Sequence, residues 1–177
     1  MTLLNVNVQL ICSLITSKMS FKVCKIFSIL ALSALTAGHP TQCPANWYNL
    51  GSDGCFYFAN EAPVMSWGDA LDFCHRLNHH AYLAEVKDAV TNARLAELSG
   101  PDMNWWLGAT DIQGGQWRWM RNGQRVSFFN WHTDEPNNMD GREHCLQLYA
   151  NQQNGIRAGA WNDLSCAKKI KPLCQLF

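Results

Sequence analysis

Residues 130–145 read NWHTDEPNNMDGREHC, and further along the chain residues 161–166 read WNDLSC. The densest set of oxygen-bearing side chains in the sequence lies in these two stretches: Glu135, Asn137, Glu143, Asn162 and Asp163. Carboxylate and carbonyl oxygens are the ligands that Ca²⁺ takes in its shells of six to eight, whereas zinc and copper prefer the nitrogen and sulfur of His and Cys. The pattern therefore predicts a calcium site built from two segments of the chain.

The first of these stretches is polar and rich in Asn and Asp, and it is too long for a simple hairpin. Long loops inside compact domains tend to carry function. Pro136 separates two candidate ligands, and a cis bond before it would turn the side chains of Glu135 and Asn137 to one side. Cys145 and Cys166 follow the two stretches, so a disulfide between them would clamp the ligand-bearing segments together.

The hydrophobic pattern around these stretches predicts helices followed by strands. Apolar residues spaced i, i+3, i+4, i+7 and i+10 from Trp67 to Leu77 indicate an amphipathic helix with Ser66 as its N-cap. A second helix is predicted over 89–98 and ends at Ser99-Gly100-Pro101. Strand-like patterns lie on both sides of a Gly/Asp turn within 43–58. Further strands are predicted over residues 104–111, 116–120, 145–149 and 172–177. Two helices followed by a loop-rich sheet indicate an α+β domain.

Residues 1–38 differ in composition from the rest of the chain, because they hold three Lys, no Asp or Glu, and an apolar run at 26–37 that is too short to span a bilayer. This is the pattern of a secretory signal peptide. We expect a secreted domain over 39–177, with 1–18 an upstream extension if Met19 is the start. Removing the three Lys leaves 11 basic against 14 acidic residues, a formal charge of −3 that argues against nucleic-acid binding.

Six of the eight cysteines lie in the expected mature domain: Cys43, Cys55, Cys74, Cys145, Cys166 and Cys174. An even number in a secreted module indicates a disulfide framework, for which sequence alone allows 15 pairings. No Cys-x-x-Cys pair is present, which argues against zinc ribbons and thioredoxin-type chemistry. The sequence also lacks the hydrolase Gly-x-Ser-x-Gly, the zinc-protease His-Glu-x-x-His and a phosphate-binding glycine loop, so we expect no enzyme activity.

These residues resemble the C-type lectin-like domain family over nearly all of 43–177. The matching positions are Cys43-Pro44, Trp47, Trp106-Leu107-Gly108, Glu135-Pro136-Asn137, Glu143, Cys145, Trp161-Asn162-Asp163, Cys166 and Cys174. The resemblance implies an α+β lectin fold with two helices, two small antiparallel sheets and a long calcium-binding loop. It also implies three disulfides in the long form: Cys43–Cys55, Cys74–Cys174 and Cys145–Cys166. The residues implied to bind both Ca²⁺ and sugar are Glu135, Asn137, Glu143, Asn162 and Asp163.

The resemblance further implies that two neighbouring sugar hydroxyls complete the calcium shell, each donating to a carboxylate and accepting from an Asn amide. Glu before Pro136 and Asn after it is the order of the mannose-type members, which favour mannose, glucose, N-acetylglucosamine or fucose, whereas galactose-type members carry Gln-Pro-Asp. We therefore expect a lectin for mannose-type glycans on microbial or host glycoconjugates, with a role in innate defence. Assembly of a homo-oligomer through the domain surface would raise its avidity.

The number of calcium ions and the kind of ligand each leave an alternative open. Relatives that bind an auxiliary calcium use further acids for it, and Asp111 could serve as one. Asn138 and His144 stand where acids are usual, so we expect one calcium and not a second tight one. Protonation of His144 beside Glu143 would weaken the calcium site near pH 6. The alternative function is a lectin-fold module that binds an ice, mineral or protein surface with calcium in a structural role.

Overall fold

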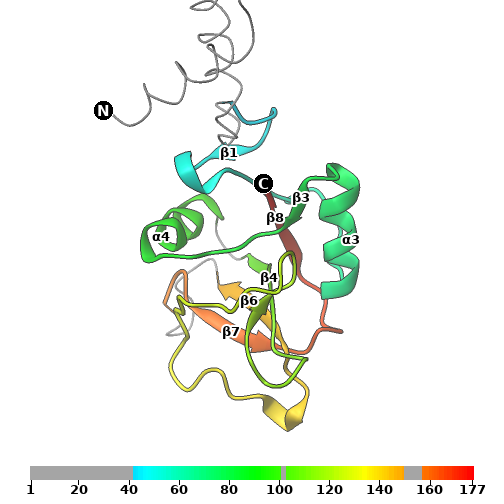
Figure 1. Cartoon of the computed structure of the whole chain (residues 1–177), viewed down its shortest axis with the longest axis vertical. Coiled ribbons are helices and arrows are strands. Elements are labelled where there is room, and N and C mark those ends of the chain that lie inside the picture. Colours follow the sequence, from blue (N-terminus) through cyan, green and yellow to red (C-terminus); the bar gives the residue numbers. More distant parts are fainter. Residues whose placement is uncertain (1–41, 101–102, 150–156) are drawn as a thin grey trace, which may run out of the picture. The chain divides into compact units, whose positions relative to one another are not determined.

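The computed structural model describes residues 42–100, 103–149 and 157–177 (Figure 1). The signal peptide expected over 1–38 and its cleavage position lie outside these residues and stay predictions. Within the described residues, no helix is both long enough and apolar enough to span a membrane.

The two α-helices in the described part of the chain are α3 (Trp67–Leu77) and α4 (Ala89–Leu98), and both confirm the sequence prediction. α3 begins after Ser66, whose hydroxyl accepts a hydrogen bond from the backbone N–H of Asp69. α4 begins after Asp88, whose carboxylate accepts two backbone N–H bonds from the first turn. Both helices therefore begin with a side-chain cap that satisfies otherwise unpaired donors.

The strands are short and most coincide with predicted ones. They are β1 (Tyr48–Asn49), β2 (Cys55–Phe58), β3 (Ala81–Leu83), β4 (Asn104–Thr110), β5 (Arg118–Trp119), β6 (Cys145–Tyr149), β7 (Trp161–Leu164) and β8 (Lys171–Leu176). Two 3-10 turns complete the described elements, η1 (Gly51–Asp53) and η2 (Met139–Gly141). Neither β3 nor β7 was predicted from the sequence.

The strands pair in the order β1-β2-β8-β4-β6-β7, with β3 also on β8 and β5 also on β4. The strands form two antiparallel groups, β1-β2-β8-β3 and β5-β4-β6-β7, in agreement with the two small antiparallel sheets that the resemblance implies. A short parallel contact between β4 and β8 joins the two groups into one sheet within the described residues. β4 is buried along almost its whole length, because it has paired strands on both of its edges inside the domain. In Figure 1, α3 and α4 lie on either side of β8, and the 130–143 loop lies at the bottom of the view.

Tryptophans form much of the core, and the side chains of Trp106 and Trp161 are fully buried. The indole N–H of Trp106 donates to the carbonyl of Met65 at 2.9 Å, which ties the segment before α3 to β4. Gly108 lets β3 approach β4, because a Cβ at this position would lie 2.5 Å from the carbonyl oxygen of Leu83. The core thus holds in place β4, β6 and β7, the strands next to the 130–143 loop.

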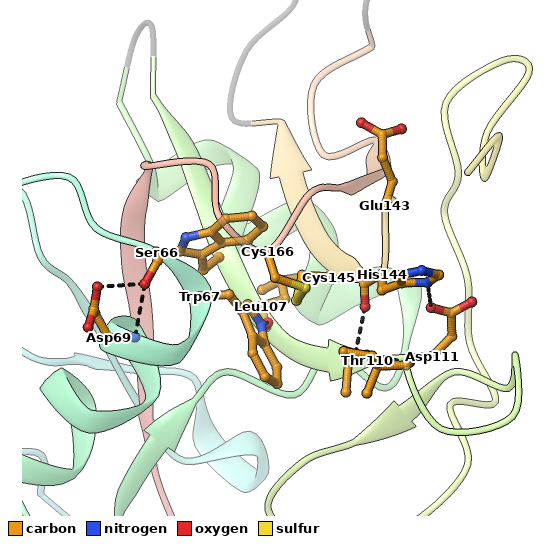
Figure 2. Close-up of a disulfide and its surroundings, with 12 residues drawn as sticks. Ser66, Trp67, Asp69, Leu107, Thr110, Asp111, Glu143, His144, Cys145 and Cys166 are labelled. Atoms are coloured by element: carbon orange, nitrogen blue, oxygen red, sulfur yellow. Dashed lines mark hydrogen bonds and ion pairs between the residues drawn. A yellow bond between two sulfur atoms is a disulfide. The ribbon is translucent and has the colours of Figure 1, made fainter. Parts of the chain in front are cut away.

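The described residues contain three disulfides, and these are the pairings that the resemblance implies. They are Cys43–Cys55, Cys74–Cys174 and Cys145–Cys166. The first closes the β1–β2 hairpin, and the second joins α3 to β8 across a sequence separation of 100 residues. The third joins the start of β6 to the residues after β7, as Figure 2 shows.

Candidate functional site

The pairing of β6 with β7 positions two of the predicted ligands. Leu146 lies opposite Asp163, and Gln147 lies opposite Asn162. Asp163 is 1% exposed and Asn162 is 6% exposed, so both are polar groups that need partners inside the fold. The Nδ2 of Asn162 donates to the Oε1 of Gln147 at 3.1 Å.

The loop before β6 brings the next two predicted ligands together. The Glu135–Pro136 bond is cis. The Nδ2 of Asn137 donates to the Oε1 of Glu135 at 3.0 Å, and its backbone N–H donates to the Oε2 of the same carboxylate at 3.1 Å. The two side chains therefore lie on the same side of the chain, as the sequence analysis expects.

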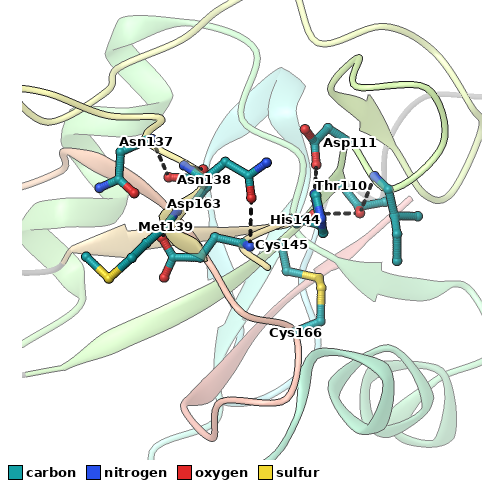
Figure 3. A network of polar contacts seen from close by, with 11 residues as sticks. Thr110, Asp111, Asn137, Asn138, Met139, His144, Cys145, Asp163 and Cys166 are labelled. Carbon is teal, nitrogen blue, oxygen red and sulfur yellow. Dashed lines mark hydrogen bonds and ion pairs between the residues drawn. A yellow bond between two sulfur atoms is a disulfide. The ribbon is translucent and has the colours of Figure 1, made fainter. Parts of the chain in front are cut away.

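Asp163 joins this loop to β7. Its Oδ1 accepts the backbone N–H of Asn137 at 3.0 Å and its Oδ2 accepts the backbone N–H of Asn138 at 2.7 Å (Figure 3). Glu143 joins the cluster from the other end of the loop through two hydrogen bonds. Its backbone N–H donates to the Oδ1 of Asn138, and its Oε2 accepts the backbone N–H of Met139. Four of the five predicted ligands are thus linked directly, or through Asn138 and Met139, by hydrogen bonds.

The acids of this cluster repel one another. Burial and the neighbouring carboxylates of Asp163 and Glu143 together raise the pKa of Glu135 to about 7, against a smaller lowering by the N–H of Asn137. Burial also raises the pKa of the Tyr149 phenol, and the charges of the same three acids add to this effect. No Lys, Arg or His forms an ion pair with these acids in the described ranges. Negative charge is therefore concentrated here without a neutralising side chain.

The donor set fits a hard cation. It consists of carboxylate oxygens and amide carbonyl oxygens, which suit Ca²⁺, and it contains no imidazole or thiolate that would favour zinc or copper. No group of three His, Cys, Asp or Glu side chains in the described residues is close enough to hold a metal ion by itself. The candidate site therefore depends on its two amides, Asn137 and Asn162, as well as on its acids.

His144 points away from the candidate ligands. Its Nδ1 lies 2.9 Å from the Oδ1 of Asp111, and its carbonyl accepts the hydroxyl of Thr110 at 2.6 Å. Figure 2 shows His144 directed at Asp111 and the carboxylate of Glu143 directed elsewhere. These contacts hold the loop after β4 against the start of β6, and they were not foreseen from the sequence.

Sequence reasoning also missed Gln147 and Tyr149, which lie beside the site on β6. Both occupy alternate positions of a correctly predicted strand, in which they alternate with the buried residues Leu146 and Leu148. The period-two pattern of a strand puts Gln147 and Tyr149 on one face and the leucines on the other. That alternation was the signal that could have placed them next to the ligand-bearing segments.

Comparison with known proteins identifies the family and its fold. Residues 64–176 match the family model of the lectin C-type domain, and the chain belongs to this family. The salivary C-type lectin 2 of Aedes albopictus is 30% identical over 70% of this chain and 84% of that protein. The EPNH mutant of CEL-I, a C-type lectin from Cucumaria echinata, is 29% identical, with a TM-score of 0.66 over 77% of this chain and 97% of that one. A calcium-independent type II antifreeze protein, 24% identical with a TM-score of 0.62 over 77% of this chain and 96% of that one, shares the fold.

Proposed function

We propose that this chain is a secreted, Ca²⁺-dependent lectin that binds mannose-type sugars at the junction of the 130–143 loop with β7. The observation that supports this most directly is the convergence of Glu135, Asn137 and Asp163 in one hydrogen-bonded cluster. A cation would neutralise the carboxylates whose mutual repulsion raises the pKa of Glu135. The signal-like segment at the start of the chain and the disulfide framework support secretion.

The five residues Glu135, Asn137, Glu143, Asn162 and Asp163 would hold the calcium ion, which when bound offers open coordination positions to two neighbouring sugar hydroxyls. The chain's own residues set the polarity of the sugar site. Glu135 offers an acceptor and the Nδ2 of Asn137 offers a donor, and these two groups form a hydrogen bond with each other at 3.0 Å. A hydroxyl that donates to Glu135 and accepts from Asn137 would replace this contact without leaving either group unpaired. This order supports a preference for mannose, N-acetylglucosamine or fucose.

The contacts of Asp111 support one calcium ion per domain. Its Oδ1 faces the ring of His144 at 2.9 Å, and Asn138 uses its side-chain oxygen to accept the N–H of Glu143. Both residues that an auxiliary cation would need are therefore engaged within the protein. A single weak sugar site also favours assembly of several copies for useful avidity, and the recognition of microbial or host glycans in innate defence is the role we propose for such an assembly.

Retention on mannose-agarose tests the proposal. We expect the mature domain, residues 39–177, to bind in calcium and to elute with either EDTA or free mannose. The double variant Glu135→Gln/Asn137→Asp, which reverses donor and acceptor, should fail to bind mannose, and Glu97→Gln on the exposed face of α4 is the matched control. Failure of the wild type to bind mannose, N-acetylglucosamine and fucose columns would overturn the sugar-binding proposal.

A module that binds an ice, mineral or protein surface is the second candidate, and the observation in its favour is the fold shared with a calcium-independent antifreeze protein. In that case calcium would have a structural role or none. Calcium-dependent thermal stabilisation without retention on any sugar column would favour this candidate. Retention that free mannose competes away would exclude it as the function of this site.

A further inference from the structure

The side-chain amide of Asn162, a proposed calcium ligand, carries a C=O and an NH₂ group of nearly equal size and opposite hydrogen-bonding chemistry. The oxygen of Asn162 can bind a cation, whereas its NH₂ group can only donate hydrogen bonds and would repel a cation. A buried Asn at a cation site therefore needs a neighbour that decides which end faces the ion. Such a neighbour, Gln147, lies directly opposite Asn162 on the adjacent strand β6.

We propose that Gln147 is a positioning residue that orients the amide of Asn162 for cation and sugar binding. The inference rests on the proposed function and deepens it. The Oε1 of Gln147 accepts one N–H of Asn162 at 3.1 Å. This contact leaves the Oδ1 of Asn162 for the cation and its second N–H for a sugar hydroxyl, which is the donor–acceptor order that a mannose-type site requires.

The position of Gln147 in β6 explains why this contact is stable. Its neighbours Leu146 and Leu148 belong to the main hydrophobic core, so the strand is anchored on the opposite face. Gln147 itself is 3% exposed, and water cannot readily replace its partner. Because a buried polar group without a partner is unfavourable, burial favours the hydrogen bond between Gln147 and Asn162.

Two substitutions separate the acceptor from the bulk of the side chain. Gln147→Met keeps the length but removes the acceptor, whereas Gln147→Glu keeps an acceptor and cannot donate. We expect Gln147→Met to bind calcium about tenfold more weakly, the equivalent of losing one buried hydrogen bond. Gln147→Glu should bind at least about threefold more tightly than Gln147→Met, because its carboxylate still orients Asn162.

The matched control is Gln175→Met. Gln175 on β8 is also 3% exposed and makes two side-chain hydrogen bonds away from the site. Its Oε1 accepts the N–H of Glu85 in a buried contact, and its Nε2 donates to the carbonyl of Asp53 in a partly buried one. Its replacement should lower the melting temperature and leave calcium affinity within about twofold of the wild type, as expected for a residue with a structural role alone.

Isothermal titration with calcium, followed by mannose, measures both affinities for the three variants and the wild type. The side-chain ¹⁵N signals of Asn162 in the calcium-free protein provide a readout that is independent of binding. We expect one of its two protons to be protected from exchange in the wild type and in Gln147→Glu, and neither in Gln147→Met. Wild-type affinity in Gln147→Met, or weaker binding by Gln147→Glu than by Gln147→Met, would overturn the role.

The two proposals can fail separately. If the wild type binds no calcium, the proposed function is wrong and the cation-orienting role falls with it, while the Asn162 signals still show whether the contact exists. If the wild type binds calcium and mannose but Gln147→Met binds both equally well, the function stands and the positioning role is refuted.

Discussion

Replacement of Glu135 by Gln should remove a pH dependence of stability that the calcium-free protein shows. Burial and the carboxylates of Asp163 and Glu143 raise the pKa of Glu135 from 4.5 to about 7. The folded protein therefore holds this proton more tightly than the unfolded chain does. The contribution of Glu135 to the free energy of unfolding is therefore fully present below about pH 4.5 and is lost as the pH rises through about 7. In Glu135→Gln this contribution to the fall is absent.

The size of the effect follows from the same shift. A change from 4.5 to about 7 corresponds to at most about 3 kcal/mol. Because solvent reaches the carboxylate and screens its charge, we expect about 1 kcal/mol between pH 5 and pH 8. Calcium should reverse the comparison, because the ion favours the ionised carboxylate and so stabilises the wild type more than the variant.

Urea unfolding in EDTA at a series of pH values measures this difference. The control is Glu97→Gln, whose carboxylate is 68% exposed in a surface pair with Arg94 and should follow the wild-type profile. If Glu135→Gln loses as much free energy as the wild type between pH 5 and pH 8, the three acids do not interact in the folded protein, and the argument from concentrated charge is wrong.

Three further predictions concern the whole domain. Addition of about 10 mM calcium should stabilise it by about 1.4–2.7 kcal/mol if the affinity is that of a weak extracellular module, and an unchanged melting temperature on chelation by EDTA would count against the site. Removal of the Cys74–Cys174 disulfide, which spans 100 residues, should lower the free energy of unfolding by about 4–5 kcal/mol, and a loss below about 1 kcal/mol in denaturant unfolding would contradict the chain-entropy argument. Gly108→Ala places a Cβ 2.5 Å from a backbone oxygen of β3 and should destabilise by about 2 kcal/mol or more, whereas Gly68→Ala on α3, with open space around it, is the control.

The parts of the fold that follow a regular pattern could be predicted from the sequence. α3 and α4 were found because their apolar spacing and capping residues agree, and β6 was found because its apolar residues form a short run. The parallel contact between β4 and β8 could not be predicted, since it joins segments far apart in the chain whose pairing leaves no local pattern. β5 was predicted over five residues and spans two, because the chain turns at 120–122, after which Gly123 and Gln124 make backbone hydrogen bonds with Trp119.

The strand β7 was not predicted as a strand, even though Asn162 and Asp163 within it were predicted as ligands. Asn162 and Asp163 are buried side by side, so the strand has no alternation of apolar and polar residues. The periodicity that reveals a strand is lost where the sequence serves a site instead of the core. The side-chain partners of these residues, Gln147 and the backbone of the 130–143 loop, come from other segments and leave no local signal in the sequence.

Asp163 connects the stability of the loop to its capacity to bind a cation. Two backbone N–H groups from the loop donate to its carboxylate at 3.0 and 2.7 Å and so hold the loop to β7. In the same cluster, burial together with the neighbouring carboxylates of Asp163 and Glu143 raises the pKa of Glu135 to about 7. Glu135 therefore binds a proton that an incoming cation would displace. The contacts that fix the loop on β7 and the acid that responds to the cation are thus different side chains of one cluster.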